Sequence, residues 1–128
     1  MSYESVKNTT KNFYAALQAN DVEAWVSNFA ENAVLEDPVG TPPRNGKAEI
    51  REFLAGVLAL TNEFGISEDH VFINENTAAV KWTGKGVGKN GRKIQFEGID
   101  LIEVNNKSEV ISLRAFWDAE STLAVLTA

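Results

Sequence analysis

Asp100 occupies a position at which an ionised carboxylate would be energetically unfavourable. If residues 94–104 form a strand, alternation puts Asp100 on one face with apolar neighbours, namely Ile94, Phe96, Gly98, Ile102 and Val104. Such period-two alternation is typical of a strand with one buried face. An ionised carboxylate there is unfavourable unless it is paired, and the usual result is a raised pKa and a neutral acid that can donate a hydrogen bond. The pattern leaves two interpretations open, a buried residue that fixes strand register or an active-site acid.

Two further side chains are candidates for the same chemistry. Tyr14 lies near the middle of a predicted N-terminal helix, beside its apolar stripe, where a tyrosine commonly gives its ring to the core and its hydroxyl to a nearby acceptor. Asp37 lies between Glu36 and Pro38, where an aspartate is commonly a turn former. Each residue alone has an ordinary structural explanation, so neither establishes a site by itself.

Composition narrows the class of protein. We expect a single domain over residues 1–128, because this length suffices for one core but not for two. The net charge of −6 argues against nucleic acid or an anionic membrane surface as a partner, since both require a basic patch. No apolar leader or long apolar run marks secretion or membrane insertion, so we expect a cytoplasmic protein.

Residue types that hold metals or cofactors are scarce. The chain has no cysteine and a single histidine, His70, whereas zinc sites usually need several such ligands. The glycines of residues 84–91 fit a hairpin rather than a phosphate-binding loop. We therefore expect no metal and no cofactor, and the remaining catalytic candidates are carboxylates, the two tyrosines, lysines and arginines.

The elements that must position these residues follow from periodicity. Helical spacing predicts helices over the first twenty residues, from Asp21 through Phe29, and over 47–60, with a short helix over 118–126. Alternation predicts strands over 33–37, 70–74, 77–87, 92–105 and 109–117. Helices first and consecutive hairpin strands later indicate an α+β fold, in which three N-terminal helices wrap a curved antiparallel sheet around an apolar pocket.

Strand parity also predicts the pocket walls. Residues expected on the inner face of the sheet or on the facing helical side are Val39, Phe53, Val80, Trp82, Leu113, Ala115 and Trp117. Ordinary core packing explains Trp82 equally well. A cavity lined in this way would suit a small, flat, hydrophobic ketone as substrate.

The combination of motifs resembles the bacterial ketosteroid isomerases. The resemblance is carried by the run Glu36-Asp37-Pro38-Val39-Gly40, by residues 43–46 and 50–53, and by shorter matches at 14–17, 91–93, 99–100 and 114–115. These matches fall in order across nearly the whole chain. The wider superfamily is that of NTF2-like and SnoaL-like cone-shaped domains, which includes polyketide cyclases. The chain departs from the isomerase pattern at Leu54, where these enzymes often carry a tyrosine that supports the oxyanion network.

The resemblance implies a role for each candidate. Asp37 would be the general base that shifts a C=C bond of a 3-oxo-Δ5-steroid or steroid-like ketone into conjugation. Tyr14 and a protonated Asp100 would donate hydrogen bonds to the dienolate oxygen, and no cofactor would be needed. The resemblance also implies a homodimer through the outer sheet face, which would carry Ile99, Leu101 and Phe116.

Two alternatives remain open at this stage. The chain could be a SnoaL-like polyketide cyclase or another proton-transfer enzyme that uses Asp37 on a different carbonyl compound. It could instead be a non-catalytic small-molecule-binding dimer module, in which Tyr14 and Asp100 are only structural. A dehydratase that relies on paired histidines is disfavoured, because His70 is the only histidine.

Overall fold

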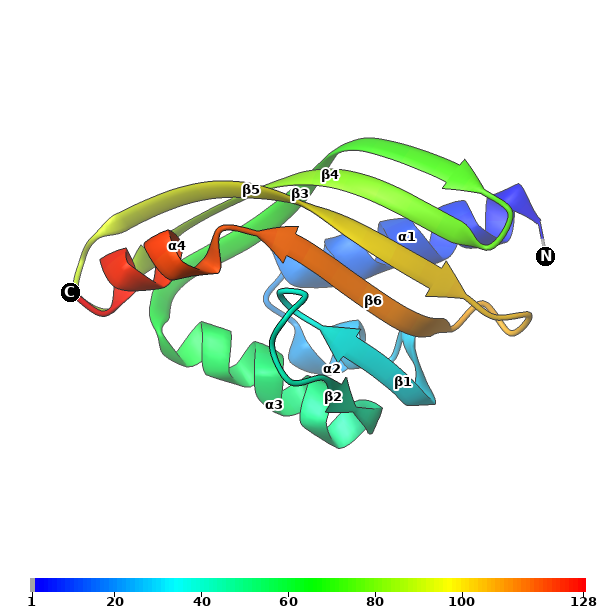
Figure 1. The fold of residues 1–128 in the computed structure, drawn as a ribbon, viewed down its shortest axis with the longest axis horizontal. Coiled ribbons are helices and arrows are strands. Elements are labelled where there is room, and N and C mark those ends of the chain that lie inside the picture. The colour runs from blue at the N-terminus through cyan, green and yellow to red at the C-terminus, as the bar shows by residue number, and fades with distance from the viewer. Residues whose placement is uncertain (1) are drawn as a thin grey trace.

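A computed structural model of the chain describes residues 2–128, which form four helices and one six-stranded sheet. The helices are α1 (Tyr3–Gln18), α2 (Val22–Val26), α3 (Gly46–Ala59) and α4 (Ala119–Leu126). The strands are β1 (Phe29–Glu36), β2 (Arg44–Asn45), β3 (Thr61–Asn74), β4 (Thr77–Gly88), β5 (Lys93–Val104) and β6 (Val110–Trp117), in the spatial order β2-β1-β6-β5-β4-β3 (Figure 1). The α+β fold class predicted from the sequence is therefore confirmed.

Short polar side chains begin three of the helices. Ser2 caps α1 by accepting a hydrogen bond from the backbone N–H of Ser5, at 3.1 Å. Asp21 caps α2 in the same way, and Asp118 caps α4. These side chains satisfy N–H groups that have no partner within the first helical turn. The helix predicted over the first twenty residues is α1, and Met1 lies outside the described residues.

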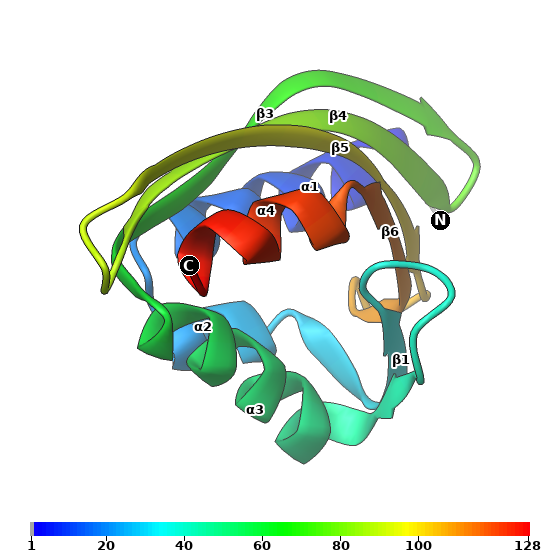
Figure 2. The same ribbon diagram turned by 60° about the vertical axis from the view of Figure 1, so that its left-hand side comes forward.

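The sheet is strongly curved, and the helices occupy its concave side. In Figure 2 strands β3, β4 and β5 arch over α1 and α4, while α2 and α3 close the opposite side. The centre of the sheet is a regular antiparallel ladder, in which β4 and β5 pair without interruption from Thr77↔Glu103 to Val87↔Lys93. An aromatic cluster fills the core beneath α1, where the ring of Phe29 lies 4.8 Å from that of Trp25 and 5.9 Å from that of Phe13. Such edge and tilted contacts add to the stabilisation from burial.

Three details differ from the prediction. The sheet is mixed, because β1 runs parallel to β6 instead of antiparallel. Strand β3 begins at Thr61 rather than near residue 70. A register shift between Glu68 and His70 exchanges the two faces of the strand at this point. The residues before the shift therefore do not continue the alternation of the residues after it, and the pattern did not reveal the first half of the strand. Helix α2 ends at Val26, so that Phe29 belongs to β1.

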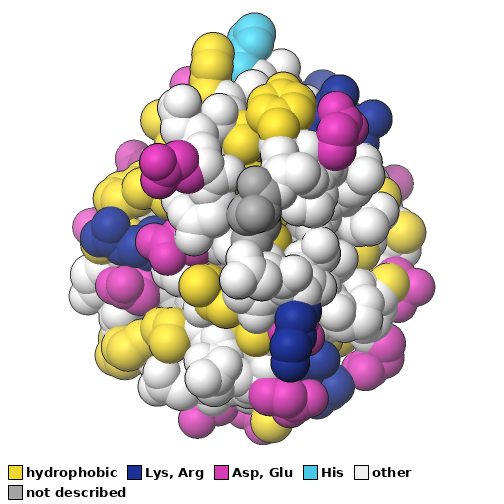
Figure 3. All heavy atoms as spheres, turned by 90° about the vertical axis from the view of Figure 1, so that its right-hand side faces the viewer, with side chains coloured by type: hydrophobic (Ala, Val, Ile, Leu, Met, Phe, Trp, Pro, Cys, Tyr) yellow, Lys and Arg dark blue, Asp and Glu magenta, His cyan; other side chains and the backbone are white. Residues whose placement is uncertain are grey.

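The surface carries charges of both signs. On the face shown in Figure 3, basic side chains lie among acidic ones rather than in a patch. His70 is exposed on β3, away from the core. Within residues 2–128, no helix combines the length and the apolar character that crossing a membrane requires.

Candidate functional site

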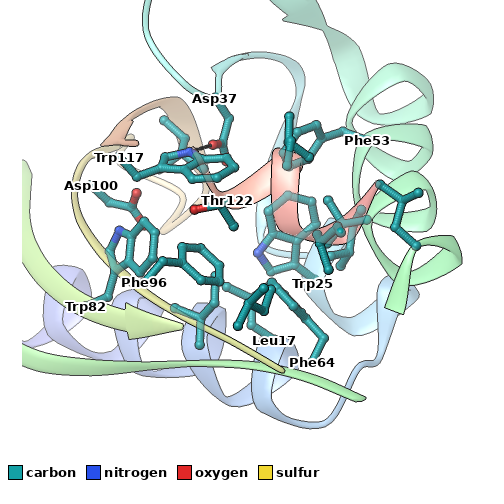
Figure 4. A pocket seen from close by; sticks show the side chains of 18 of the residues that line it. Leu17, Trp25, Asp37, Phe53, Phe64, Trp82, Phe96, Asp100, Trp117 and Thr122 are labelled. Carbon is teal, nitrogen blue, oxygen red and sulfur yellow. Dashed lines mark hydrogen bonds between the residues drawn. The ribbon is translucent and has the colours of Figure 1, made fainter. Parts of the chain in front are cut away.

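An apolar cavity lies between the concave face of the sheet, α3 and α4. Its free volume is about 80 Å³. Seven aromatic side chains dominate its wall, namely Phe13, Trp25, Phe53, Phe64, Trp82, Phe96 and Trp117; Figure 4 labels all of them except Phe13. Two carboxyl groups, those of Asp37 and Asp100, face this otherwise apolar space. Within the described chain, no cluster of three or more His, Asp or Glu side chains is arranged to hold a metal ion.

Asp100 lies at the centre of the sheet, in the row that the strand pattern predicts. On β5 it pairs with Val80 of β4 and Ala115 of β6, and only 6% of its surface is exposed. Burial, and then the charge of Asp37, raises the pKa of Asp100 to about 7, while the hydrogen bond from Tyr14 and the proximity of the Trp82 indole N–H oppose this rise. The Trp82 N–H approaches Asp100 without reaching hydrogen-bonding geometry, and no other described residue accepts from it. The Asp100 carboxyl therefore keeps its proton for about half of the time at neutral pH.

The Tyr14 hydroxyl is the partner of Asp100. It donates a hydrogen bond to Oδ2 of Asp100 at 2.6 Å, and the tyrosine side chain is completely buried. Burial, and then the charge of Asp100, raises the pKa of Tyr14 well above its ordinary value, so the hydroxyl keeps its proton. Asp100 is among the residues that line the cavity and Tyr14 is not, so the tyrosine hydroxyl lies behind the Asp100 carboxyl.

Asp37 lies just beyond the end of β1, next to the end of β6. The indole N–H of Trp117 donates a hydrogen bond to Oδ1 of Asp37 at 2.6 Å. The following loop is fixed to β6, because the N–H of Val39 donates to the carbonyl oxygen of Ala115 at 2.8 Å. Burial raises the pKa of Asp37 to about 6, whereas Trp117 and the positive charge of Arg44 lower it.

The two carboxyl groups therefore differ in protonation. Near neutral pH Asp37 is largely ionised, while Asp100 retains its proton for a larger share of the time. An ionised carboxylate can remove a proton from a bound molecule, and a neutral acid can donate a hydrogen bond to oxygen. A pair of acidic groups whose environments separate their pKa values in one cavity is the arrangement expected for acid–base chemistry.

The remaining residues predicted from the sequence divide into two groups. Phe53, Trp82, Leu113 and Trp117 line the cavity together with the two carboxyl groups. Val39, Val80 and Ala115 are not among the lining residues. Val80 and Ala115 have the predicted parity, but they are buried on either side of Asp100, since parity gives the face of a strand and not the depth at which the cavity begins.

Other parts of the wall were missed. Phe96 has the same parity as Asp100, so the strand pattern contained the signal for it. Trp25 and the α4 residues Thr122, Leu123 and Leu126 gave no such signal, because their place in the wall depends on how helices pack on the sheet. Leu54 also lines the cavity, where it presents an apolar side chain instead of a further hydroxyl group.

Comparisons with known proteins agree with this architecture. Residues 10–110 match the model of the SnoaL-like domain family. An epoxide hydrolase/cyclase-like enzyme, SalBIII, described for its role in pyran ring formation in polyether salinomycin, is 26% identical; the alignment covers 91% of this chain and 92% of that chain, with a TM-score of 0.82.

Two more distant structures share the fold. An NTF2-like protein of unknown function from Burkholderia pseudomallei is 16% identical, with a TM-score of 0.85 and full coverage of both chains. A Mycobacterium tuberculosis protein, solved in complex with estradiol-17beta-hemisuccinate, is 18% identical, with a TM-score of 0.81 and coverage of 91% of this chain and 95% of that chain. With most of its length matched by the family model, the chain belongs to the SnoaL-like domain family and has the NTF2-like fold.

Proposed function

We propose that the protein is a cofactor-independent isomerase that moves a C=C bond from β,γ to α,β conjugation in a 3-oxo-Δ5-steroid or a steroid-like ketone. The observation that carries this proposal is the Tyr14–Asp100 hydrogen bond behind an apolar cavity that also contains Asp37. The motif around Asp37, in which the isomerase resemblance is strongest, provides the second support.

In this mechanism Asp37 acts as a base and then as an acid. Its carboxylate removes a proton from the carbon between the ketone and the double bond. The electrons of that C–H bond form a new C=C bond, and the carbonyl π electrons move to oxygen, which gives a dienolate. Asp37 then returns the proton to the γ-carbon, the carbonyl re-forms, and the remaining double bond becomes conjugated with it.

Asp100 stabilises the dienolate in this proposal. As a neutral acid it donates a hydrogen bond to the developing oxyanion, and Tyr14 strengthens the donor from behind. Because the cavity is apolar, such a bond is stronger than in water, and removal of one oxyanion donor typically costs about 100- to 1,000-fold in rate. Asp37 and Asp100 are the catalytic residues in this scheme, and Phe53 and Trp117 would contact the substrate rings.

Admission of a steroid-sized ligand requires a change in the cavity wall. The free volume of about 80 Å³ is smaller than the ~300–1,000 Å³ of ligand pockets in general. Helix α4 forms part of the wall through Thr122, Leu123 and Leu126. We therefore expect α4 to move outward when a large ligand enters.

A second candidate function is cyclisation or epoxide opening. It is favoured by the 26% identity to SalBIII, an epoxide hydrolase/cyclase-like enzyme. The same pair could serve this chemistry, since Asp37 could activate a hydroxyl nucleophile while Asp100 donates to the oxygen that develops charge. The third candidate is a non-catalytic small-molecule-binding module. For each of these functions we expect a homodimer through the outer sheet face, where Ile99 of β5 and Phe116 of β6 lie opposite each other and are exposed.

An absorbance assay tests the proposal. Wild-type protein is mixed with 5-androstene-3,17-dione, and formation of the conjugated enone is followed against Asp37→Asn. Asp69→Asn is the matched control, because Asp69 is an exposed carboxylate that pairs with Lys81 outside the cavity. We expect turnover in wild type and Asp69→Asn and a loss of at least about 100-fold in Asp37→Asn. Absence of turnover above background in wild type would exclude the steroid isomerase function.

A further inference from the structure

The indole N–H of Trp25 is a buried hydrogen-bond donor without a partner among residues 2–128. Only 2% of the Trp25 surface is exposed, and no described residue offers its Nε1 atom a hydrogen-bond acceptor. Trp25 lines the cavity, and in Figure 4 its nitrogen points into the space that the other lining side chains surround. Buried donors are nearly always paired, so an unpaired one that faces a cavity marks a place for an acceptor.

The local structure holds this donor in a fixed direction. Asp21 begins helix α2, and its side chain accepts a hydrogen bond from the N–H of Ala24, immediately before Trp25. The indole ring is packed against Phe13 and Phe29, with ring centroids 5.6 Å and 4.8 Å away. The packed ring has little freedom to turn its N–H toward another acceptor, so the donor is preorganised.

The position of Trp25 is separate from that of the carboxyl groups. Trp25 belongs to α2, whereas Asp100 is on β5 and Asp37 follows β1. In Figure 4 Trp25 lies across the cavity from Asp100, with aromatic side chains between them. The unpaired indole of Trp82, by contrast, lies beside Asp100, at the end of the cavity that holds the two carboxyl groups.

We propose that Trp25 Nε1 donates a hydrogen bond to a second oxygen atom of the ligand, distinct from the oxygen that meets Asp100. Since an indole N–H is a donor only, the ligand atom must be an acceptor such as a ketone, ester or ether oxygen. The ligand class is therefore an apolar molecule with an oxygen at each end. This inference requires the cavity to be a ligand site, as the proposed function does, but it does not require isomerisation.

Two probe pairs test the inference by heteronuclear NMR of the tryptophan indole N–H groups. Each pair compares a ketone with an analogue that lacks the acceptor: cyclohexanone with methylenecyclohexane, and estrone with 17-deoxyestrone. The chain has three tryptophans, and Trp25→Phe assigns the resonance while keeping an aromatic ring. We expect the ketones to move the Trp25 resonance downfield, as hydrogen bonding does, and the analogues to leave it near the free position.

Affinities give the second readout. A neutral hydrogen bond should make the ketone bind about 3- to 10-fold more tightly than its analogue in wild type, and Trp25→Phe should remove this ratio. Unchanged Trp82 and Trp117 resonances in Trp25→Phe show that the fold is intact. The inference is wrong if neither ketone moves the Trp25 resonance beyond its analogue, or if the ratio persists in Trp25→Phe.

These measurements distinguish failure of the inference about Trp25 from failure of the proposed isomerase function. Cyclohexanone reports on the Trp25 donor whether or not the protein accepts a steroid. If cyclohexanone binds at Trp25 and no conjugated enone forms, the isomerase proposal fails and the inference holds. If enone forms and the ketone preference survives in Trp25→Phe, the inference alone fails.

Discussion

Replacement of Asp100 by asparagine should change the pH dependence of stability more than stability itself. Burial raises the pKa of Asp100 in the folded protein from 3.8 to about 7. Between these two values the folded state holds a proton that the unfolded chain has lost, so stability falls as pH rises toward 7. The introduced asparagine would stay neutral at every pH and could still accept the hydrogen bond from Tyr14. Asp100→Asn should therefore lack this part of the pH dependence.

The magnitude follows from the width of the pH window. Each pKa unit corresponds to about 1.4 kcal/mol, and from about pH 5.5 to the folded pKa there are about 1.5 units. Wild type should thus lose about 2 kcal/mol relative to Asp100→Asn between about pH 5.5 and about pH 8.5. Most of the loss occurs below about pH 7, and it is complete by about pH 8.5, where both states are deprotonated. This range stays above the isoelectric point near 4.8, where solubility is lowest.

Urea unfolding followed by tryptophan fluorescence measures this difference. Asp69→Asn is the matched control, since hydrogen bonds from Lys81 and Thr83 lower the pKa of Asp69 and keep it ionised throughout the window. Its stability difference from wild type should be constant with pH. A constant difference for Asp100→Asn as well, or one in which wild type gains stability as pH rises, would refute the raised pKa of Asp100.

Three further predictions concern the surroundings of the site. Trp117→Phe removes the donor that lowers the pKa of Asp37, so the carboxyl resonance of Asp37 should titrate above pH 6 and higher than in wild type; an unchanged or lower pKa would exclude this role. Asn90→Ala removes hydrogen bonds to the carbonyl groups of Val125 and Leu126 in the last turn of α4 and of Ala128 beyond it, so amide exchange over 119–126 should become faster; unchanged exchange would mean that apolar packing alone holds the helix. Ile99→Lys places a charge on the exposed sheet face and should weaken a dimer in sedimentation equilibrium, whereas a wild type that is monomeric at all concentrations would exclude the dimer.

The alternation of apolar and polar residues was sufficient to predict structural features that depend on a single strand. Alternation over 94–104 predicts both β5 and the burial of Asp100, and the structure confirms both. The pattern also places Trp82 and Leu113 on the inner face, where they line the cavity. In each case the prediction depends only on whether successive side chains point inward or outward.

Properties that depend on several elements were not predictable in this way. The parallel pairing of β1 with β6 depends on the position in the fold at which α2 ends and β1 begins, and no local sequence pattern encodes that position. The hydrogen bond from Tyr14 to Asp100, which places the hydroxyl behind the carboxyl, depends on how deeply α1 packs against the sheet. The short helix over 118–126 was predicted, but its position across the cavity depends on contacts such as those of Asn90.

The central claim is that, of the two cavity carboxyl groups, Asp100 has the higher pKa and holds a proton for the larger share of the time. Infrared spectroscopy at about pH 6.5, midway between the two pKa values, detects the carbonyl band of a protonated carboxylic acid. The band should be present in wild type, strongly reduced in Asp100→Asn, and retained in Asp37→Asn, though weaker because the charge that raises the pKa of Asp100 is gone. A band that survives in Asp100→Asn and disappears in Asp37→Asn would contradict the claim.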